Sequence, residues 1–304
     1  MVRRNSVVLA LLFIGSTAIL TEPLSIRAGA TDRILGWRSE LWKGTVSSYA
    51  EFDDAGVPAA IGIVFSATAM DGLPASGSDQ HHCFDRNKDG VVDLATECYQ
   101  DYEFVIPLPD AVSRRSDIPF KWVFLNWNPG GHLPHGVWDL PHFDIHFVIE
   151  PIALLLGIES GPCGPSLDGY VRCDQYELAK KPVPSNYMHP DFRAGRTVVP
   201  AMGLHWYDPT TPEFRKEQVF TWSWLYGTYD GKITFYEAMV TRAFLVSKPS
   251  VCYQIKAPPA VGLRGFYPTL SCVRYNVDTA EYTVSLEKFV SRQVSDPEPG
   301  EAKR

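Results

Sequence analysis

Residues 128–150 read NPGGHLPHGVWDLPHFDIHFVIE, a stretch that combines four histidines with several carboxylates. From its third proline, Pro141, onward, phenylalanine and isoleucine alternate with polar side chains, and this composition favours a β-strand. In a strand, His142, Asp144 and His146 share one face of the sheet. In a helix, His142 and His146 would stand one turn apart, with roughly 5–6 Å between their Cβ atoms. We expect the strand, entered through a bend or bulge at Pro141.

The segments around this stretch are also strand-like. Residues 120–127 place large apolar side chains on both faces, which is typical of a buried strand. Residues 219–229 and 232–245 form a predicted hairpin joined at Asp230-Gly231. The pattern predicts a mainly β fold, an antiparallel barrel or sandwich with short helices and disulfide-clipped insertions.

The 304 residues suffice for one large domain. We expect a single β domain over residues 31–250, interrupted by an insertion at residues 76–100. Residues 251–294 form a predicted C-terminal extension packed on that domain, and residues 295–304 a disordered tail. The formal net charge of −7 and the lack of a basic stripe in the sequence argue against nucleic acid as a partner.

The N-terminus has the pattern of an export signal. Arg3 and Arg4 precede an apolar run over residues 7–20, and Ala-Gly-Ala at residues 28–30 resembles a cleavage site. The run is shorter than the about 20 residues that span a membrane. We expect residues 1–30 to be a cleaved signal peptide, which leaves a secreted or periplasmic protein without a transmembrane span; an uncleaved signal anchor is the alternative.

All six cysteines lie after the predicted cleavage site. An even number of cysteines in an oxidising compartment indicates disulfides, whereas a zinc–thiolate site would favour a C-x-x-C pair that this sequence lacks. Six cysteines permit many pairings, and proximity along the chain favours local ones. The expected pairs are Cys83 with Cys98, Cys163 with Cys173, and Cys252 with Cys272.

The predicted insertion contains DRNKDGVVD, which begins at Asp85 and resembles an EF-hand calcium loop. Oxygen-bearing side chains alternate along it, and Gly90 stands where such a loop turns sharply. The usual final glutamate position is Thr96, with Glu97 one place late. We expect a stand-alone calcium loop closed by the Cys83–Cys98 disulfide, and an ion-free surface turn is the alternative. The predicted calcium ligands are Asp85, Asn87, Asp89, Val91, Asp93 and Glu97.

Two later segments carry polar residues in apolar surroundings. His205 lies in the sequence Met-Gly-Leu-His-Trp, and Glu237 shares a predicted strand face with Phe235 and Met239. A carboxylate among apolar neighbours is costly unless it is paired or bound to a metal. Imidazole and carboxylate are the usual ligands of a divalent transition metal, with zinc preferred here and iron or copper as alternatives. The predicted ligands of one shared site are His132, His142, His146, His205 and Glu237.

Each of these side chains also has a purely structural interpretation. A histidine in an aromatic strand can be a hydrogen-bonded core residue, Glu237 can pair with Arg242, and Asp144 can orient a histidine instead of binding the ion. Independent structural roles explain four histidines in one short stretch poorly, so we favour the metal site.

Three stretches, GGHLPHGVWDLPHFDIHF, VPAMGLHWYDP and YGTYDGKITFYEAM, resemble in this order a family of secreted bacterial proteins of unknown function. That family is typified by an extracytoplasmic Thermus protein under envelope-stress (sigma-E) control. The resemblance covers roughly residues 44–75 and 103–245. It implies a mainly β homo-oligomer, a ring-like decamer in the Thermus member, with no assigned reaction. The calcium-like insertion and the segment from Val251 onward depart from the family and put the same oligomer in question. The family's polar positions fall on His132, His142, His146, His205 and Glu237.

A weaker resemblance is to the first cupin motif. Asp144, His146, Glu150 and Gly157 follow its spacing, with aspartate in place of the first histidine. This resemblance implies a cupin-like fold as the alternative architecture.

The sequence thus predicts a secreted protein with a His/Glu metal site and a separate calcium loop. One alternative is a metal-dependent enzyme, a hydrolase or an oxygenase. The other is a calcium-stabilised structural or envelope-stress oligomer without catalysis. The sequence contains neither G-x-S-x-G nor G-x-G-x-x-G, so it supports no serine hydrolase or dinucleotide enzyme. It indicates no substrate.

Overall fold

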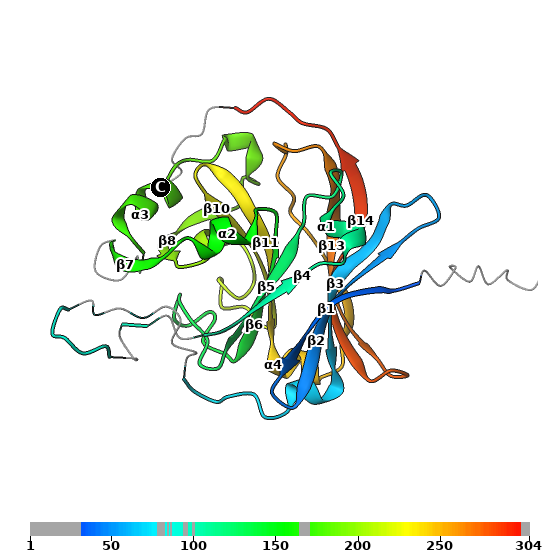
Figure 1. Ribbon diagram of the computed structural model, residues 1–304, viewed down its shortest axis with the longest axis horizontal. Helices are drawn as coiled ribbons and strands as arrows, with labels where there is room; N and C mark the ends of the chain where they lie inside the picture. The colour runs from blue at the N-terminus through cyan, green and yellow to red at the C-terminus, as the bar shows by residue number, and fades with distance from the viewer. Residues whose placement is uncertain are drawn as a thin grey trace, which may run out of the picture. The chain divides into compact units, whose positions relative to one another are not determined.

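The computed structural model describes residues 32–77, 83, 85, 87–93, 97–98, 101–163 and 171–298. Over these residues the chain forms two antiparallel sheets, of six and seven strands, and neither closes into a barrel (Figure 1). The predicted mainly β fold is therefore confirmed as a sandwich with short helices. The predicted signal peptide and residues 299–304 of the predicted tail lie outside the described residues.

The first sheet joins both ends of the described chain. Its strand order is β1-β2-β3-β14-β13-β12, and β14 pairs with β3 from Ser66 opposite Glu281 to Ala60 opposite Glu287. Figure 1 accordingly shows the blue N-terminal strands beside the orange and red C-terminal strands. Its strands are β1 (Ile34–Leu41), β2 (Gly44–Phe52), β3 (Pro58–Ser66), β12 (Ser250–Gln254), β13 (Gly265–Asn276) and β14 (Glu281–Arg292).

This pairing involves the C-terminal part of the chain. Residues 251–294, the predicted C-terminal extension, contribute β13, β14 and most of β12 to the same sheet as β1–β3. The long β13–β14 hairpin carries backbone donors and acceptors on both edges, and β3 and β12 pair with them.

The second sheet holds the histidine-rich stretch. Its strand order is β4-β5-β6-β11-β10-β9-β8, so β6 lies between β5 and β11. The expected strand at residue 142 and the expected hairpin at Asp230-Gly231 are both present. Its strands are β4 (Tyr102–Pro107), β5 (Trp122–Asn128), β6 (His142–Val148), β8 (Arg193–Val199), β9 (Gly203–Tyr207), β10 (Trp222–Tyr229) and β11 (Lys232–Thr241).

Short elements connect the strands and cover the second sheet's outer face, the face turned away from the first sheet. Residues of α2, α3 and β8–β9 pack there against Trp122, Phe124, Val148 and Phe235. The short elements are η1 (Ala67–Met70), α1 (Asp110–Ser113), α2 (Ile152–Leu156), β7 (Ser160–Cys163), α3 (Cys173–Ala179), η2 (Ser185–Tyr187) and α4 (Arg242–Val246). No helix among the described residues is long and apolar enough to cross a membrane.

The core between the sheets explains the composition of β5 and β6, whose residues are all buried. On the inner face, Val123, Leu125 and Phe143 belong to one cluster with Ile63 and Val284 of the first sheet. Because side chains alternate along a strand, the polar residues of β6 fall on the outer face. The buried residues of β6 therefore include a row of polar side chains, called here the polar stripe, on the outer face.

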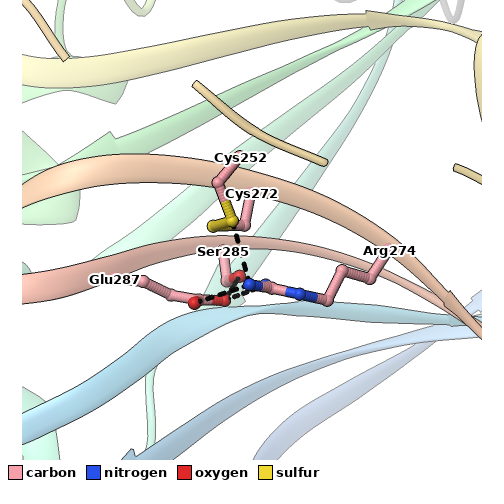
Figure 2. Close-up of a disulfide and its surroundings, with 5 residues drawn as sticks. All are labelled: Cys252, Cys272, Arg274, Ser285 and Glu287. Atoms are coloured by element: carbon pink, nitrogen blue, oxygen red, sulfur yellow. Dashed lines mark hydrogen bonds and ion pairs between the residues drawn. A yellow bond between two sulfur atoms is a disulfide. The ribbon is translucent and has the colours of Figure 1, made fainter. Parts of the chain in front are cut away.

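The three expected disulfides are present, Cys83–Cys98, Cys163–Cys173 and Cys252–Cys272. No described cysteine is free. Figure 2 shows the third disulfide, with Arg274 beside Cys252 and paired with Glu287 of β14. Such cross-links are typical of proteins in an oxidising compartment.

The described start of the predicted tail is attached to the domain. Asn186 donates from Nδ2 to the carbonyl of Asp296 at 2.8 Å, and Tyr187 donates from its hydroxyl to the carbonyl of Ser295 at 2.7 Å. Residues 295, 296 and 298 therefore have hydrogen-bond partners on η2.

Candidate metal centre

Strand register builds the polar stripe on the outer face of the second sheet. His146 of β6 lies directly opposite Glu237 of β11 and opposite Phe124 of β5. Directly opposite residues project on the same face, so the imidazole and the carboxylate meet there. His205 of β9 lies two strands from Glu237, opposite Gly227 of β10. Three strands that are distant in sequence thus bring two histidines to one glutamate.

These residues form the first group, the Glu237 cluster (His146, His205 and Glu237). The Nε2 atom of His146 lies 3.5 Å from Oε1 of Glu237, and Nε2 of His205 lies 3.6 Å from Oε2. Both distances exceed those of good hydrogen bonds. Ligand atoms bound to one ion at about 2.0–2.1 Å in tetrahedral geometry stand roughly 3.3 Å apart. The spacing therefore fits a shared cation better than direct hydrogen bonds.

Two atoms of this cluster are buried without hydrogen-bond partners. His146 uses Nδ1 to donate to the carbonyl of Phe124 at 2.9 Å, which leaves Nε2 as the lone-pair nitrogen of a neutral ring. Neither this Nε2 nor Oε2 of Glu237 has a hydrogen-bond partner. Both side chains are only 1 % exposed. A neutral histidine anchored through Nδ1 to a carbonyl is the usual arrangement of a metal-binding imidazole.

Burial sets the protonation states of the Glu237 cluster. It lowers the pKa of His146 to about 4, and burial together with neighbouring His146 lowers the pKa of His205 to about 3. Burial, reinforced by the charge of Asp144, raises the pKa of Glu237 well above its ordinary value. Without metal at neutral pH, both imidazoles are therefore neutral, and burial favours the protonated form of the Glu237 carboxyl. A bound dication would displace that proton and use all three lone pairs.

The ring of Phe235 holds the two imidazoles in place. It packs edge-on against His146, with centroids 4.7 Å apart, and lies 5.2 Å from His205. The ring occupies the space above Gly227, where an added Cβ would approach it to 2.0 Å. A side chain at residue 227 of β10 would collide with the Phe235 ring, so glycine is needed for the ring to lie beside the cluster.

The second group is the Asp144 cluster (His132, His142 and Asp144). His142 Nε2 lies 3.1 Å from Asp144 Oδ1, and His132 Nε2 lies 3.2 Å from Asp144 Oδ2. Asn128 also donates from Nδ2 to Oδ2 of Asp144 at 2.8 Å. His142 and Asp144 come from β6, whereas His132 comes from the loop before it.

Opposing effects set the charges of the Asp144 cluster. Burial alone would raise the pKa of Asp144, but the facing His142 and His132 lower it well below its ordinary value. Burial alone would lower the pKa of His132, yet the Asp144 carboxylate raises it. Without metal, the aspartate is therefore an anion that faces both histidines.

The structure changes the predicted ligand set in one respect. The five predicted ligands divide between the two clusters, with His146, His205 and Glu237 in one and His132 and His142 in the other. Asp144, which was not among the predicted ligands, joins His132 and His142 as a potential ligand. The period-two spacing of His142, Asp144 and His146 was the signal for it.

The predicted calcium loop is described only in part. Asp85 accepts through Oδ2 from the backbone N–H of Gly90 at 2.8 Å and through Oδ1 from that of Asp89 at 3.1 Å. Glu97 accepts from the N–H groups of Asn87 at 2.9 Å and Asp93 at 3.0 Å. The first and last predicted ligands thus hold the turn together. Gly90 has a φ of 86°, as the sharp turn requires.

A cavity of about 530 Å³ opens beside the Asp144 cluster. It lies between the loop of residues 136–140 and the segment of residues 213–220. Its wall includes Phe220, which packs edge-on against His142 at 5.2 Å between centroids. His142 itself is fully buried behind this wall.

No family model, curated protein or solved structure matches this chain. The resemblance to the Thermus family therefore rests on the quoted sequence stretches alone. The functional argument depends on the geometry of the two clusters.

Proposed function

We propose that this protein is a secreted metal-binding protein whose Glu237 cluster binds one divalent transition metal. The observation that supports this proposal most directly is that two buried atoms, His146 Nε2 and Glu237 Oε2, have no hydrogen-bond partner. His205 completes the cluster around them. Leaving such groups unpaired costs about 1–3 kcal/mol each, and a cation removes that cost for both. The three disulfides support export to an oxidising compartment.

The donor set indicates the class of ion. Two imidazoles and one carboxylate bind zinc in hydrolytic sites and iron in oxygen-activating sites. Zinc is the first choice because it accepts three protein ligands plus water. His205 is the most accessible of the three residues that would hold the ion, with 19 % of its side chain exposed, so water would reach the ion from the side of His205. The chemistry available there is Lewis-acid activation of a bound water.

Elemental analysis of tag-free protein tests this proposal. Wild type is compared with His146→Ala and Glu237→Gln, and with the control His189→Ala, which lies outside both clusters. We expect each cluster variant to bind one equivalent less zinc than wild type, and the control to bind the wild-type amount. Unchanged zinc content in both cluster variants would refute the assignment.

Calcium binding by the Asp85–Asp93 loop is a second proposed property. Its support is that Asp85 and Glu97, the first and last predicted ligands, already accept hydrogen bonds from backbone N–H groups of the turn. Calcium should raise the melting temperature by binding to the native state. Asp85→Asn should abolish this rise, whereas Asp278→Asn in an exposed turn should preserve it. No rise in wild type up to millimolar calcium would reject this loop as a site.

A further inference from the structure

We propose that the Asp144 cluster is a second, separate binding site for a divalent transition metal. It shares no ligand with the Glu237 cluster, so it goes beyond the proposed function and does not depend on it. Its three ligand atoms lie within 4.8 Å of one another.

The contact between His142 and Asp144 requires a positive charge. His142 donates from Nδ1 to the carbonyl of Leu140 at 2.6 Å, so its Nε2 carries the lone pair when the ring is neutral. That nitrogen faces Asp144 Oδ1 at 3.1 Å, and neither atom has another hydrogen-bond partner. Two buried lone pairs this close repel each other. A cation between them turns the repulsion into two ligand bonds.

The loop before β6 is shaped to supply the third ligand. His132 donates its backbone N–H to the carbonyl of Trp138 at 3.1 Å, which closes the loop on itself. Gly131 precedes it with a φ of 69°, and an added Cβ would meet the Trp138 carbonyl oxygen at 2.2 Å. This tight approach directs the His132 ring to Asp144, while Nδ1 contacts the Leu133 carbonyl at 2.8 Å.

A proton on His132 is the competing explanation, and it accounts for only half of the cluster. The His132 imidazolium would pair with Oδ2 of Asp144, the same oxygen that accepts from Asn128. Pairing Oδ1 of Asp144 with Nε2 of His142 would need a second proton, on His142, and would place two buried imidazolium ions against one carboxylate. A metal ion replaces the proton on His132 and resolves both contacts.

The two clusters form neighbouring mononuclear sites, not a bridged pair of ions. Asp144 and His146 are two residues apart on β6, which corresponds to about 7 Å along a strand. Metals that share a bridging ligand stand about 3.5–4 Å apart. Because each filled site carries net positive charge, occupation of one should weaken the other. His132 is 22 % exposed, so the second ion enters through the loop that carries this ligand.

Cobalt(II) titration of metal-free protein tests the second site, because cobalt replaces zinc and its visible absorption reports each filled site. We expect two equivalents in wild type, one in Asp144→Asn, one in Glu237→Gln and none in the double variant. His132→Ala, which removes a partly exposed loop ligand, should also bind one equivalent. This variant tests the second site if Asp144→Asn does not fold. The exposed His135→Ala is the matched control and should bind two.

The outcomes separate this proposal from the proposed function. One equivalent in wild type that persists in Asp144→Asn and in His132→Ala overturns the second site and leaves the Glu237 site intact. One equivalent that is lost in Asp144→Asn but kept in Glu237→Gln upholds the Asp144 site and overturns the proposed function. Two equivalents in both Asp144→Asn and His132→Ala also overturn the second site.

Discussion

His146 and Glu237 lie directly opposite each other on β6 and β11, with Nε2 and Oε1 3.5 Å apart and both side chains 1 % exposed. An antiparallel pair of this kind fixes the two side chains through the backbone, so the contact does not depend on a flexible loop. Two strands separated by about 90 residues in sequence meet only because the sheet places β6 beside β11. The spacing that suits a cation is therefore a property of the sheet itself.

Glu237→Gln should affect metal-free and metal-bound protein in opposite directions. The raised pKa of Glu237 means that its folded carboxyl stays protonated while the unfolded chain ionises above its ordinary pKa. The metal-free folded state is therefore penalised as the pH rises, and glutamine removes that penalty. With excess zinc, the variant should lose the about 3 kcal/mol that an ion at a hundredfold excess over Kd provides.

Thermal unfolding at pH 8, with a chelator and with excess zinc, measures both effects. The control is Glu217→Gln, because Glu217 is exposed and belongs to neither cluster. We expect Glu237→Gln to melt above wild type with the chelator and below it with zinc. A lower melting temperature under both conditions would show that Glu237 stabilises the fold without a metal.

Metal-free protein should lose stability as the pH falls from about 6.5 to about 4. Burial lowers the folded-state pKa of His146 to about 4, so between these limits the unfolded chain binds a proton that the folded chain does not. The loss from His146 alone is about 3 kcal/mol. Urea unfolding with a chelator should show a shallower pH dependence in His146→Phe, and an identical dependence in both proteins would contradict a buried neutral His146.

The sequence predicted the composition of the site better than its arrangement. The alternation of His142, Asp144 and His146 placed them on one strand face, and a separation of four residues was already too long for one ion. Glu237 among apolar neighbours correctly indicated a buried polar partner. What the sequence could not predict was the pairing of β6 with β11, because strand partners are set by long-range packing. Because of that pairing, His146 lies beside Glu237, whereas His142 lies beside Asp144.

The C-terminal strands show the same limit. Residues 251–294 have no local feature that distinguishes an added layer from strands inside a sheet. Their position follows from β14 pairing with β3, a contact between residues that are more than 200 positions apart. The disulfides were predictable because each joins neighbours in sequence, at separations of 15, 10 and 20 residues.

Lys256→Met should destabilise the protein through the aspartate it leaves behind. Lys256 Nζ lies 2.5 Å from Asp208 and 2.6 Å from Asp191, and Asp208 is only 3 % exposed. Removing the cation leaves the buried Asp208 carboxylate with only its hydrogen bonds from Thr210, at a cost of about 1–3 kcal/mol. Lys181→Met is the control because Lys181 and Asp230 form an exposed pair, worth at most about 1 kcal/mol. Equal urea midpoints for the two variants would contradict a special role for Lys256.

Gly227→Ala should weaken metal binding although residue 227 is not itself a ligand. The new Cβ would approach the Phe235 ring to 2.0 Å, and that ring is buried between the imidazoles of His146 and His205. Overpacking of this kind costs about 1–3 kcal/mol, and the ring can yield only by displacing the two ligands.

Zinc affinity and urea unfolding of Gly227→Ala therefore have to be measured together. The control is Gly130→Ala, because Gly130 is exposed and its added Cβ meets nothing within 4 Å. We expect Gly227→Ala to lose both stability and zinc affinity, and Phe235→Leu in the same chain to restore stability by vacating the space above residue 227. Lost stability with unchanged zinc affinity would mean that the ring supports the sheet but does not position the histidines. Restored stability without restored affinity in the double variant would instead identify the aromatic ring itself as the element that holds His146 and His205 toward Glu237.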